Sequence, residues 1–222
     1  PVKGETQTQS QKLVRDIHLA SEPRSQELIR RLNRAPAGTL DLVSMRADLL
    51  VAMANAPQLK QIDNDFRHLF SSWFNRGFLE LRLINWDNTP AVILEKIISY
   101  EAIHEINGWD ELRLRVAAED RRLYGFFHPA LSAEPLIFVE VAMTASIPKA
   151  IAPILAKQRQ HLNPAEATTA VFYSISNCQK GLQGISFGNF LIKQVVEELR
   201  HEFTNLRQFV TLSPFPEMRH WV

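Results

Sequence analysis

The apolar residues of this chain change their spacing once, near Trp73–Gly77. Before that point they recur every three or four positions, which is typical of helices that bury one face. After it, short strand-like runs of apolar residues are interleaved with helical patterns. We therefore predict an α+β chain with two parts, a helical bundle over residues 1–73 and a mixed α/β domain over residues 74–222.

The first part is predicted to contain three helices, over residues 22–34, 39–54 and 57–73. Pro23 suits a first helical turn, and Thr39 is a good N-cap for the second helix. In the third helix, Asp63 and Asp65 are expected to lie off the apolar stripe. The stripes favour a core or an oligomer surface over a cofactor pocket, because the sequence has no paired Glu-x-x-His motif of the bundle metal sites.

The second part is predicted to alternate strands with helices, as mixed α/β domains do. Strands are predicted over residues 79–86, 121–128, 135–143, 169–176 and 207–213. Helices are predicted from the Thr89-Pro90 cap to about Tyr100, from Trp109 (capped by Asn107) to about Ala118, and over residues 147–157 and 189–203.

Charge and cysteine content exclude several classes of protein. The 222 residues hold 25 Lys and Arg against 24 Asp and Glu, so bulk electrostatics favour neither nucleic acid nor an anionic membrane as a partner. No apolar run reaches the roughly 18 residues that span a bilayer, no secretory leader is visible, and no cluster has zinc-ligand spacing. The single cysteine, Cys178, fits a reducing compartment, so we expect a cytoplasmic location and leave an organellar matrix open.

The segment before the last long helix is rich in glycine. Gly181, Gly184 and Gly188 fall within eight positions, although the chain has only 8 glycines. Glycines between a strand and a helix let the backbone turn tightly and expose its N–H groups, which favours binding of a pyrophosphate. An ordinary tight turn is an equal alternative. The segment is neither a P-loop nor a Gly-x-Gly-x-x-Gly fingerprint.

Four stretches of the sequence carry a resemblance to known proteins. The run Gln179–Gly184 and the order of elements after Trp73 resemble the GNAT fold, in which such a loop cradles the pyrophosphate of coenzyme A. More specifically, AVFYSISNCQKGLQGISFGNFLIKQVVEEL and EFTNLRQFVTLSPFPEMRHW resemble the malonyl-CoA decarboxylase family. QLKQIDNDFRHLFSSWFNRGFL and EPLIFVEVAM are also similar to it, so the resemblance runs from about Leu40 to Val222.

This resemblance implies a fold, a reaction and an assembly. It implies a helical bundle used for self-association, in a homotetramer, followed by a GNAT-like catalytic domain. The implied reaction converts malonyl-CoA to acetyl-CoA and carbon dioxide, with no cofactor beyond the coenzyme A of the substrate. The family's acyl-CoA-binding loop falls on Gln183, Gly184, Ile185, Ser186, Phe187, Gly188 and Asn189.

The resemblance also implies a catalytic pair. The family's catalytic serine falls on Ser213. Its catalytic histidine belongs to an Asn-Pro-x-Ala-x-Phe-His segment that these 222 residues do not contain, and Glu217 stands where a glycine is usual. We therefore expect the GNAT-like domain to be truncated at its C-terminus and this chain alone to be inactive.

The chemistry of decarboxylation accounts for such a pair. Loss of carbon dioxide leaves a carbanion that the thioester carbonyl delocalises as an enolate, so a metal or an electron sink is not required. The protein must offer donors to the enolate oxygen and protonate the carbanion. A lone serine is a poor acid and base, hence the need for a histidine.

The sequence also allows other functions and other catalytic residues. A GNAT-type N-acyltransferase, or a non-catalytic module for acyl-CoA binding or oligomerisation, are the alternatives. His104, His128 and His220 are weaker catalytic candidates. Cys178 is expected to be a small packing residue rather than a reactive thiol. The basic pairs Arg30-Arg31 and Arg121-Arg122 are expected on solvated faces, with contact of one pair to the adenosine phosphates of coenzyme A as the alternative.

Overall fold

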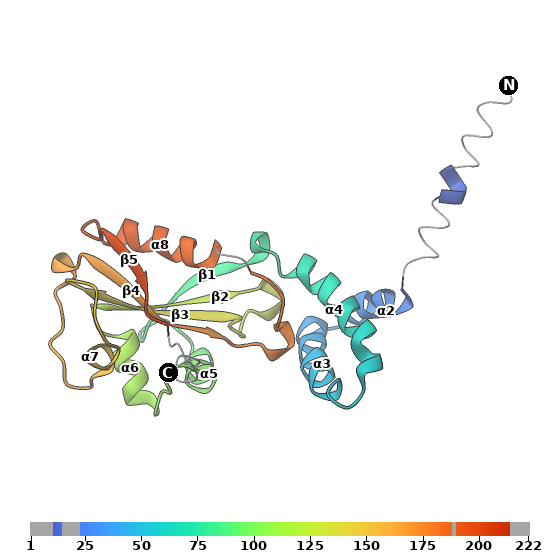
Figure 1. Ribbon diagram of the computed structural model, residues 1–222, viewed down its shortest axis with the longest axis horizontal. Helices are drawn as coiled ribbons and strands as arrows, with labels where there is room; N and C mark the ends of the chain where they lie inside the picture. The colour runs from blue at the N-terminus through green and yellow to red at the C-terminus, as the bar shows by residue number, and fades with distance from the viewer. Residues whose placement is uncertain (1–10, 15–22, 188–189, 214–222) are drawn as a thin grey trace, which may run out of the picture.

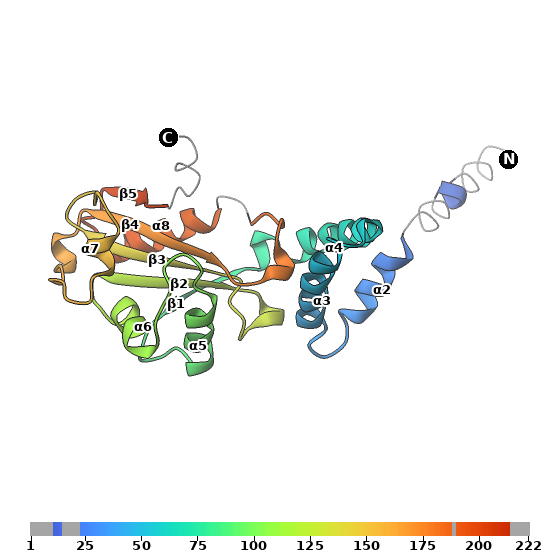
Figure 2. The ribbon, with the colours of Figure 1, turned by 60° about the horizontal axis from the view of Figure 1, so that its bottom comes forward.

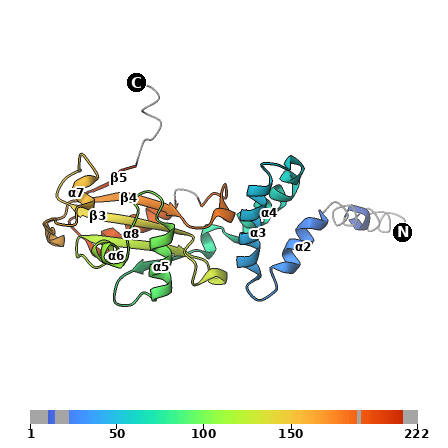
Figure 3. The same cartoon turned by 90° about the horizontal axis from the view of Figure 1, so that it is seen from below.

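The computed structural model describes residues 11–14, 23–187 and 190–213. A helical unit lies beside a sheet domain (Figure 1). The helical unit consists of α2 (Arg24–Leu32), α3 (Gly38–Ala52) and α4 (Lys60–Trp73), with a 3-10 turn, η1 (Pro57–Leu59), before α4. Figure 3 shows the three helices packed at one end of the sheet domain. The three helices predicted here are confirmed.

The start of α3 differs from the prediction. Ala37 is the N-cap, with a left-handed φ of 59°, and no side chain caps the helix. The Thr39 hydroxyl instead donates to the Asn33 side chain at 2.8 Å. A tight turn between α2 and α3 accounts for the shifted start of the helix. It brings Gly38 so close to the Leu32 carbonyl that a Cβ on Gly38 would lie 2.2 Å from the oxygen.

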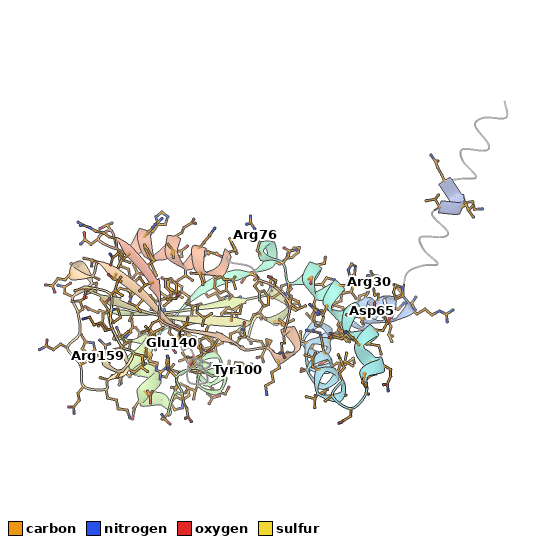
Figure 4. The ribbon with its side chains drawn as sticks, viewed as in Figure 1. Arg30, Asp65, Arg76, Tyr100, Glu140 and Arg159 are labelled. Carbon is orange, nitrogen blue, oxygen red and sulfur yellow. The ribbon has the colours of Figure 1, made fainter. Side chains whose placement is uncertain are left out.

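The two aspartates of α4 also contradict the prediction, since both are buried. Asp63 receives a hydrogen bond from the Arg46 guanidinium, and Asp65 accepts from the side chains of Ser25 and Gln26 on α2. Figure 4 shows Asp65 facing α2. Both carboxylates therefore face neighbouring helices, where partner groups offset the cost of removing them from water.

The sheet domain contains five strands in the order β1-β2-β3-β4-β5. They are β1 (Glu80–Ile84), β2 (Arg121–Phe127), β3 (Ile137–Thr144), β4 (Thr169–Asn177) and β5 (Gln208–Thr211). Neighbouring strands are antiparallel except β4 and β5, which are parallel. Parallel neighbours need a crossover, and α8 (Phe190–Glu202) supplies it.

Helices cover both faces of the sheet (Figure 2). On one face α5 (Ala91–Tyr100) and α6 (Trp109–Val116) pack against apolar side chains such as Leu123 and Phe138. On the other face α8 packs against Tyr124, Phe126 and Val139. Two helices after β1, an antiparallel run, and a loop before α8 form the expected GNAT-like order, which is confirmed.

Two further predictions need correction. The helix predicted over residues 147–157 is shortened to α7 (Ala152–Leu155), in a stretch that contains Pro148 and Pro153. Arg121 is buried instead of solvated, and its guanidinium donates to the Asp120 and Ile154 carbonyls. Within the described residues, no helix is long and apolar enough to cross a bilayer.

The boundary predicted at residues 73–74 follows α4 directly, before the 3-10 turn η2 (Arg76–Phe78). The apolar core is continuous across it, because one cluster of buried side chains joins Val43 and Phe70 of the helical unit to Leu182 and Val195 of the sheet domain. The two parts are therefore packed on each other, and the helical unit forms one side of the junction between them.

Candidate functional site

The glycine loop, residues 178–187, follows β4 and lies at the junction with the helical unit (Figure 1). It contains the 3-10 turn η5 (Lys180–Leu182), and Gly184 follows with a left-handed φ of 76°. The predicted site residues Gly188 and Asn189 lie outside the described residues. Positive φ explains the glycine at position 184, because L side chains rarely adopt that backbone conformation.

The loop presents backbone donors. The N–H groups of Leu182, Gln183 and Ile185 donate to carbonyls within the loop at 2.9–3.0 Å. In contrast, the N–H groups of Gly184 and Phe187 have no hydrogen-bond partner among the residues that the structure describes. Gly184 is exposed, so its donor is available to an anion from solvent.

A pocket of about 340 Å³ opens beside the glycine loop. It brings together four predicted site residues, Gln183, Gly184, Ile185 and Phe187, while Ser186 is exposed on the same loop. The remaining lining residues come from the end of β4, the start of the loop and the segment before β3: Asn177, Gln179, Lys180, Leu182 and Leu136. The lining therefore combines apolar side chains with amides and one ammonium group.

The helical unit supports the glycine loop from behind. Arg46 of α3 is only 1% exposed, and its Nη1 atom donates to the carbonyls of Gly181 at 2.6 Å and Gln183 at 2.9 Å. Its Nε atom donates to Asp63 at 2.8 Å. At Gly181 the two backbones approach so closely that an added Cβ would lie 1.8 Å from the Val43 oxygen.

Sequence reasoning missed Arg46, although a signal was present. Arg46 follows Val43 by three residues and Leu42 by four, so it shares the apolar stripe of α3. A charged residue on a stripe that packs into a core needs a buried partner of opposite charge. Asp63 follows Leu59 by four residues and precedes Phe66 by three, so the pairing of the two charged residues could be predicted.

Ser213 lies just after β5, beside the part of β4 that pairs with no described strand on that side. Pairing between β4 and β5 ends at Phe172 and Thr211, and the Leu212 N–H donates to the Phe172 carbonyl at 2.8 Å. From Tyr173 to Asn177, β4 has no strand partner on that side among the described residues. The exposed Ser213 does not line the pocket, but it is connected to the glycine loop along roughly 16 Å of β4, at about 3.3 Å per residue.

A buried polar cluster lies on the α5 side of this part of β4. Glu101, just after α5, accepts hydrogen bonds from the hydroxyls of Ser174 and Ser176 at 2.8–3.1 Å. It also accepts from the backbone N–H groups of Ile103 and His104 at 2.9 and 2.7 Å. The carboxylate is thus fully supplied with donors, and it fixes the α5–α6 loop against β4.

Glu140 of β3 is a second buried carboxylate in the sheet (Figure 4). Its oxygens lie 3.2 and 3.3 Å from Arg115 Nη1. Burial raises the pKa of Glu140 to about 7, against the opposing effect of Arg115. Burial likewise raises the pKa of Tyr173. Neither residue lines the pocket beside the glycine loop.

The remaining candidates have structural partners. Cys178 is buried, and burial raises the pKa of its thiol, so the prediction of a packing residue is confirmed. His104 Nε2 lies 3.2 Å from the Tyr173 carbonyl. His128 Nδ1 accepts from the Ala130 N–H, and burial lowers the pKa of His128. His220 lies outside the described residues, among which no group of three His, Cys, Asp or Glu could hold a metal ion.

Comparisons with known proteins converge on one family. The family model of the malonyl-CoA decarboxylase C-terminal domain matches residues 77–222, and the model of the N-terminal domain matches residues 3–74. Mitochondrial malonyl-CoA decarboxylase of Anser anser anser is 39% identical over 207 residues, which cover 90% of this chain and 40% of that relative. The mitochondrial enzyme of Rattus norvegicus is 36% identical over 216 residues, covering 93% of this chain and 43% of the relative.

Solved structures give the same result. Malonyl-CoA decarboxylase from Rhodopseudomonas palustris is 61% identical, with a TM-score of 0.89 over 92% of this chain and 50% of that one. The structure from Agrobacterium vitis is 62% identical, with a TM-score of 0.88 over 94% of this chain and 50% of that one. The chain thus spans about half the length of these relatives or less. The sequence matches cover both parts of the chain, and the glycine loop and the order of the strands agree with them. This chain therefore belongs to the malonyl-CoA decarboxylase family.

Proposed function

We propose that the protein decarboxylates malonyl-CoA to acetyl-CoA and carbon dioxide. One observation carries the proposal: the glycine loop lies at one end of a stretch of β4 without a second strand neighbour, and Ser213 lies at the other. Among the described residues, the N–H groups of Gly184 and Phe187 in that loop have no acceptor. An acyl-CoA is a linear molecule with phosphates at one end and a reactive thioester at the other. A phosphate site and a hydroxyl joined by a strand edge match that order of groups.

The proposed binding mode follows from the groups that each part offers. The pyrophosphate would accept hydrogen bonds from the Gly184 and Phe187 N–H groups, with Lys180 of the pocket lining adding positive charge. The pantetheine arm carries amides, which suit the backbone of β4 between Ser174 and Asn177, where no described strand pairs on that side. The thioester would then reach the level of Ser213.

The proposed reaction requires little of the protein beyond placement. The bond between the carboxylate and the α-carbon breaks, its electron pair moves into the thioester as an enolate, and carbon dioxide leaves. The Ser213 hydroxyl would donate to the enolate oxygen or relay the proton that the α-carbon receives. We propose a histidine as its partner, of the kind found in the family's Asn-Pro-x-Ala-x-Phe-His segment. We propose no cofactor beyond the coenzyme A of the substrate, because the thioester carbonyl itself accepts the electron pair.

The assay uses malonyl-CoA with the purified protein, without added metal, nucleotide or amine, and mass spectrometry detects acetyl-CoA. We expect acetyl-CoA above the spontaneous rate from the full-length protein, and no turnover from these 222 residues alone. If a product forms only when an amine is added, the protein is an acyltransferase instead. If malonyl-CoA binds without any turnover, this chain alone is a binding module, and the pair needed for catalysis is incomplete in it.

Ser213→Ala tests the role of the hydroxyl. We expect kcat to fall roughly 10²–10³-fold while the Kd of acetyl-CoA stays unchanged, because the hydroxyl acts on the reacting carbon and not on the phosphates. Ser146→Ala is the matched control, since Ser146 is also exposed and lies in the loop after β3. Equal loss of turnover and binding in Ser213→Ala would remove the serine from the reaction.

We further propose that the helical unit mediates self-association into a tetramer. Its surface carries exposed apolar side chains, including Leu28, Met45, Val51 and Ile62. Exposed apolar side chains of this kind are buried when subunits associate. Light scattering of the protein and of Val51→Lys tests this: we expect an oligomer that the charged variant weakens, and a monomeric wild-type protein would contradict it.

A further inference from the structure

Two exposed guanidinium groups flank the glycine loop, and both come from residues that precede β1. Arg67 lies on α4, and its Cζ and Nη2 atoms are 3.9 Å from the position that a Cβ would take on Gly184. Arg76 lies in η2, and its Cζ atom is 5.0 Å from the centroid of the Phe190 ring, at the first residue of α8. Figure 4 shows Arg76 where the helical unit meets the start of α8.

Neither guanidinium has an ion-pair partner among the described residues. Several other arginines contact carboxylates at 2.5–3.2 Å, such as Arg46 with Asp63, Arg115 with Glu140 and Arg159 with Asp120. Arg67 and Arg76 have no such contact. Among the described residues, the charges of these two guanidinium groups are therefore unpaired, and the Gly184 N–H beside Arg67 has no acceptor.

The stacking of Arg76 on Phe190 has a functional consequence. A guanidinium over an aromatic face is held in one orientation by the ring, while its N–H groups in the plane stay available to an acceptor. An arginine fork matches a phosphate by two parallel hydrogen bonds. The stacking thus holds the Arg76 guanidinium beside the first residue of α8 before any ligand arrives.

We propose that Arg67 and Arg76 bind phosphate groups of the acyl-CoA, Arg67 beside Gly184 and Arg76 beside the first residue of α8. This inference rests on the proposed function, and it names the residues that recognise the nucleotide end of the substrate. It also gives the helical unit a second role, because Arg67 belongs to α4. The acyl-CoA site would then be incomplete in the sheet domain alone.

The test is calorimetric titration of the purified protein with coenzyme A, with dephospho-coenzyme A and with pantetheine. We expect Arg67→Ala and Arg76→Ala each to weaken binding of coenzyme A about tenfold, with pantetheine unaffected, because a charge-assisted contact to phosphate is lost. A variant that has lost a contact to the 3′-phosphate binds dephospho-coenzyme A as the wild type does. A variant that has lost a pyrophosphate contact binds both nucleotides more weakly. The wild-type affinity for coenzyme A should also fall with added salt, and less so in the variants.

Arg200→Ala is a matched control. Arg200 is exposed and, like Phe190, belongs to α8. Its Cζ atom lies 5.1 Å from the ring centroid of Phe209. It stands about 15 Å from Phe190 along α8, at 1.5 Å per residue. If Arg67→Ala and Arg76→Ala bind coenzyme A as tightly as Arg200→Ala, the inference is wrong and the proposed function stands. If the wild-type protein binds no coenzyme A, both fall together. Circular dichroism confirms that each variant is folded.

Discussion

Arg46 and Asp63 form a buried ion pair between α3 and α4, and the same guanidinium holds the glycine loop by the carbonyls of Gly181 and Gln183. One side chain therefore joins two helices of the helical unit to the loop proposed to bind acyl-CoA. A guanidinium can serve three acceptors at once because its donors diverge in one plane. An ammonium group has no such fork, and this difference makes the pair testable.

Arg46→Lys is expected to separate binding from folding. The lysine keeps a positive charge beside Asp63 but cannot reach all three oxygens, so the loop should lose part of its support. We expect KM for malonyl-CoA to rise severalfold, with kcat little changed. Arg46→Met removes the charge and leaves Asp63 buried without a partner, which should cost about 3–5 kcal/mol of unfolding free energy.

The control for both variants is the exposed pair of Arg31 and Glu27 on α2. Their side chains are 71% and 49% exposed, so Arg31→Met should change the unfolding free energy by less than about 1 kcal/mol. Chemical denaturation gives the free energies, and steady-state kinetics give KM and kcat. A KM in Arg46→Lys equal to that of Arg31→Met would show that the loop does not depend on Arg46.

Gly184→Ala is expected to weaken acyl-CoA binding through the backbone. Little stands in the way of a Cβ at this position, since the nearest atoms belong to Arg67 at 3.9 Å, but the φ of 76° is strained for alanine by about 1–2 kcal/mol. Relief of that strain would rotate the Gly184 N–H away from the pocket. We expect the Kd of acetyl-CoA to rise severalfold in a calorimetric titration.

Two other glycines separate the possible causes. Gly108 also has a positive φ, of 91°, and nothing lies within 4 Å of its added Cβ, so Gly108→Ala should lose similar stability without loss of binding. Gly181→Ala should lose the most stability, because its Cβ meets the Val43 backbone at 1.8 Å. If Gly184→Ala and Gly108→Ala bind acetyl-CoA equally well, the turn at Gly184 is not part of the site.

The sequence predicts the helices and strands better than the side-chain contacts between them. The apolar periods of α4 and α8 locate both helices to within a few residues, because local spacing reflects which face is buried. Arg46 and Asp63 are 17 residues apart, and Arg46 and Gly181 are 135 apart, so no local pattern joins them. Likewise the positions of Arg67 and Arg76 beside the glycine loop depend on how the helical unit packs on the sheet, which spacing alone does not determine.

Cys178 is expected to be unreactive in the folded protein although it begins the glycine loop. Its side chain is buried among apolar residues, and burial raises the pKa of the thiol, so little thiolate forms near neutral pH. Iodoacetamide at pH 8 should label the native protein far more slowly than the protein in denaturant, as measured by intact mass. Rapid labelling of the native protein would mean that the loop opens around Cys178.

Glu140 is expected to make the stability of the protein depend on pH. Its pKa is about 7 in the folded protein, because burial disfavours the charged form more than Arg115 favours it, with Glu101 adding repulsion. The unfolded value is near 4.5, so the folded state holds the proton more tightly between these two values. The contribution of Glu140 to stability is therefore greatest below pH 4.5 and is lost as the pH rises to 7. The loss amounts to about 3 kcal/mol at 1.36 kcal/mol per pKa unit.

Glu140→Gln isolates this effect from the other titrating groups. Glutamine resembles the protonated carboxyl group and can still accept from Arg115, so the variant should match the wild type at low pH and exceed its stability by a few kcal/mol at pH 8. Urea denaturation of both proteins from pH 4.5 to 8 gives the difference at each pH. A difference that stays constant over this range would mean that Glu140 titrates near its ordinary pKa. The ion pair with Arg115 would then offset the cost of burial in this sheet.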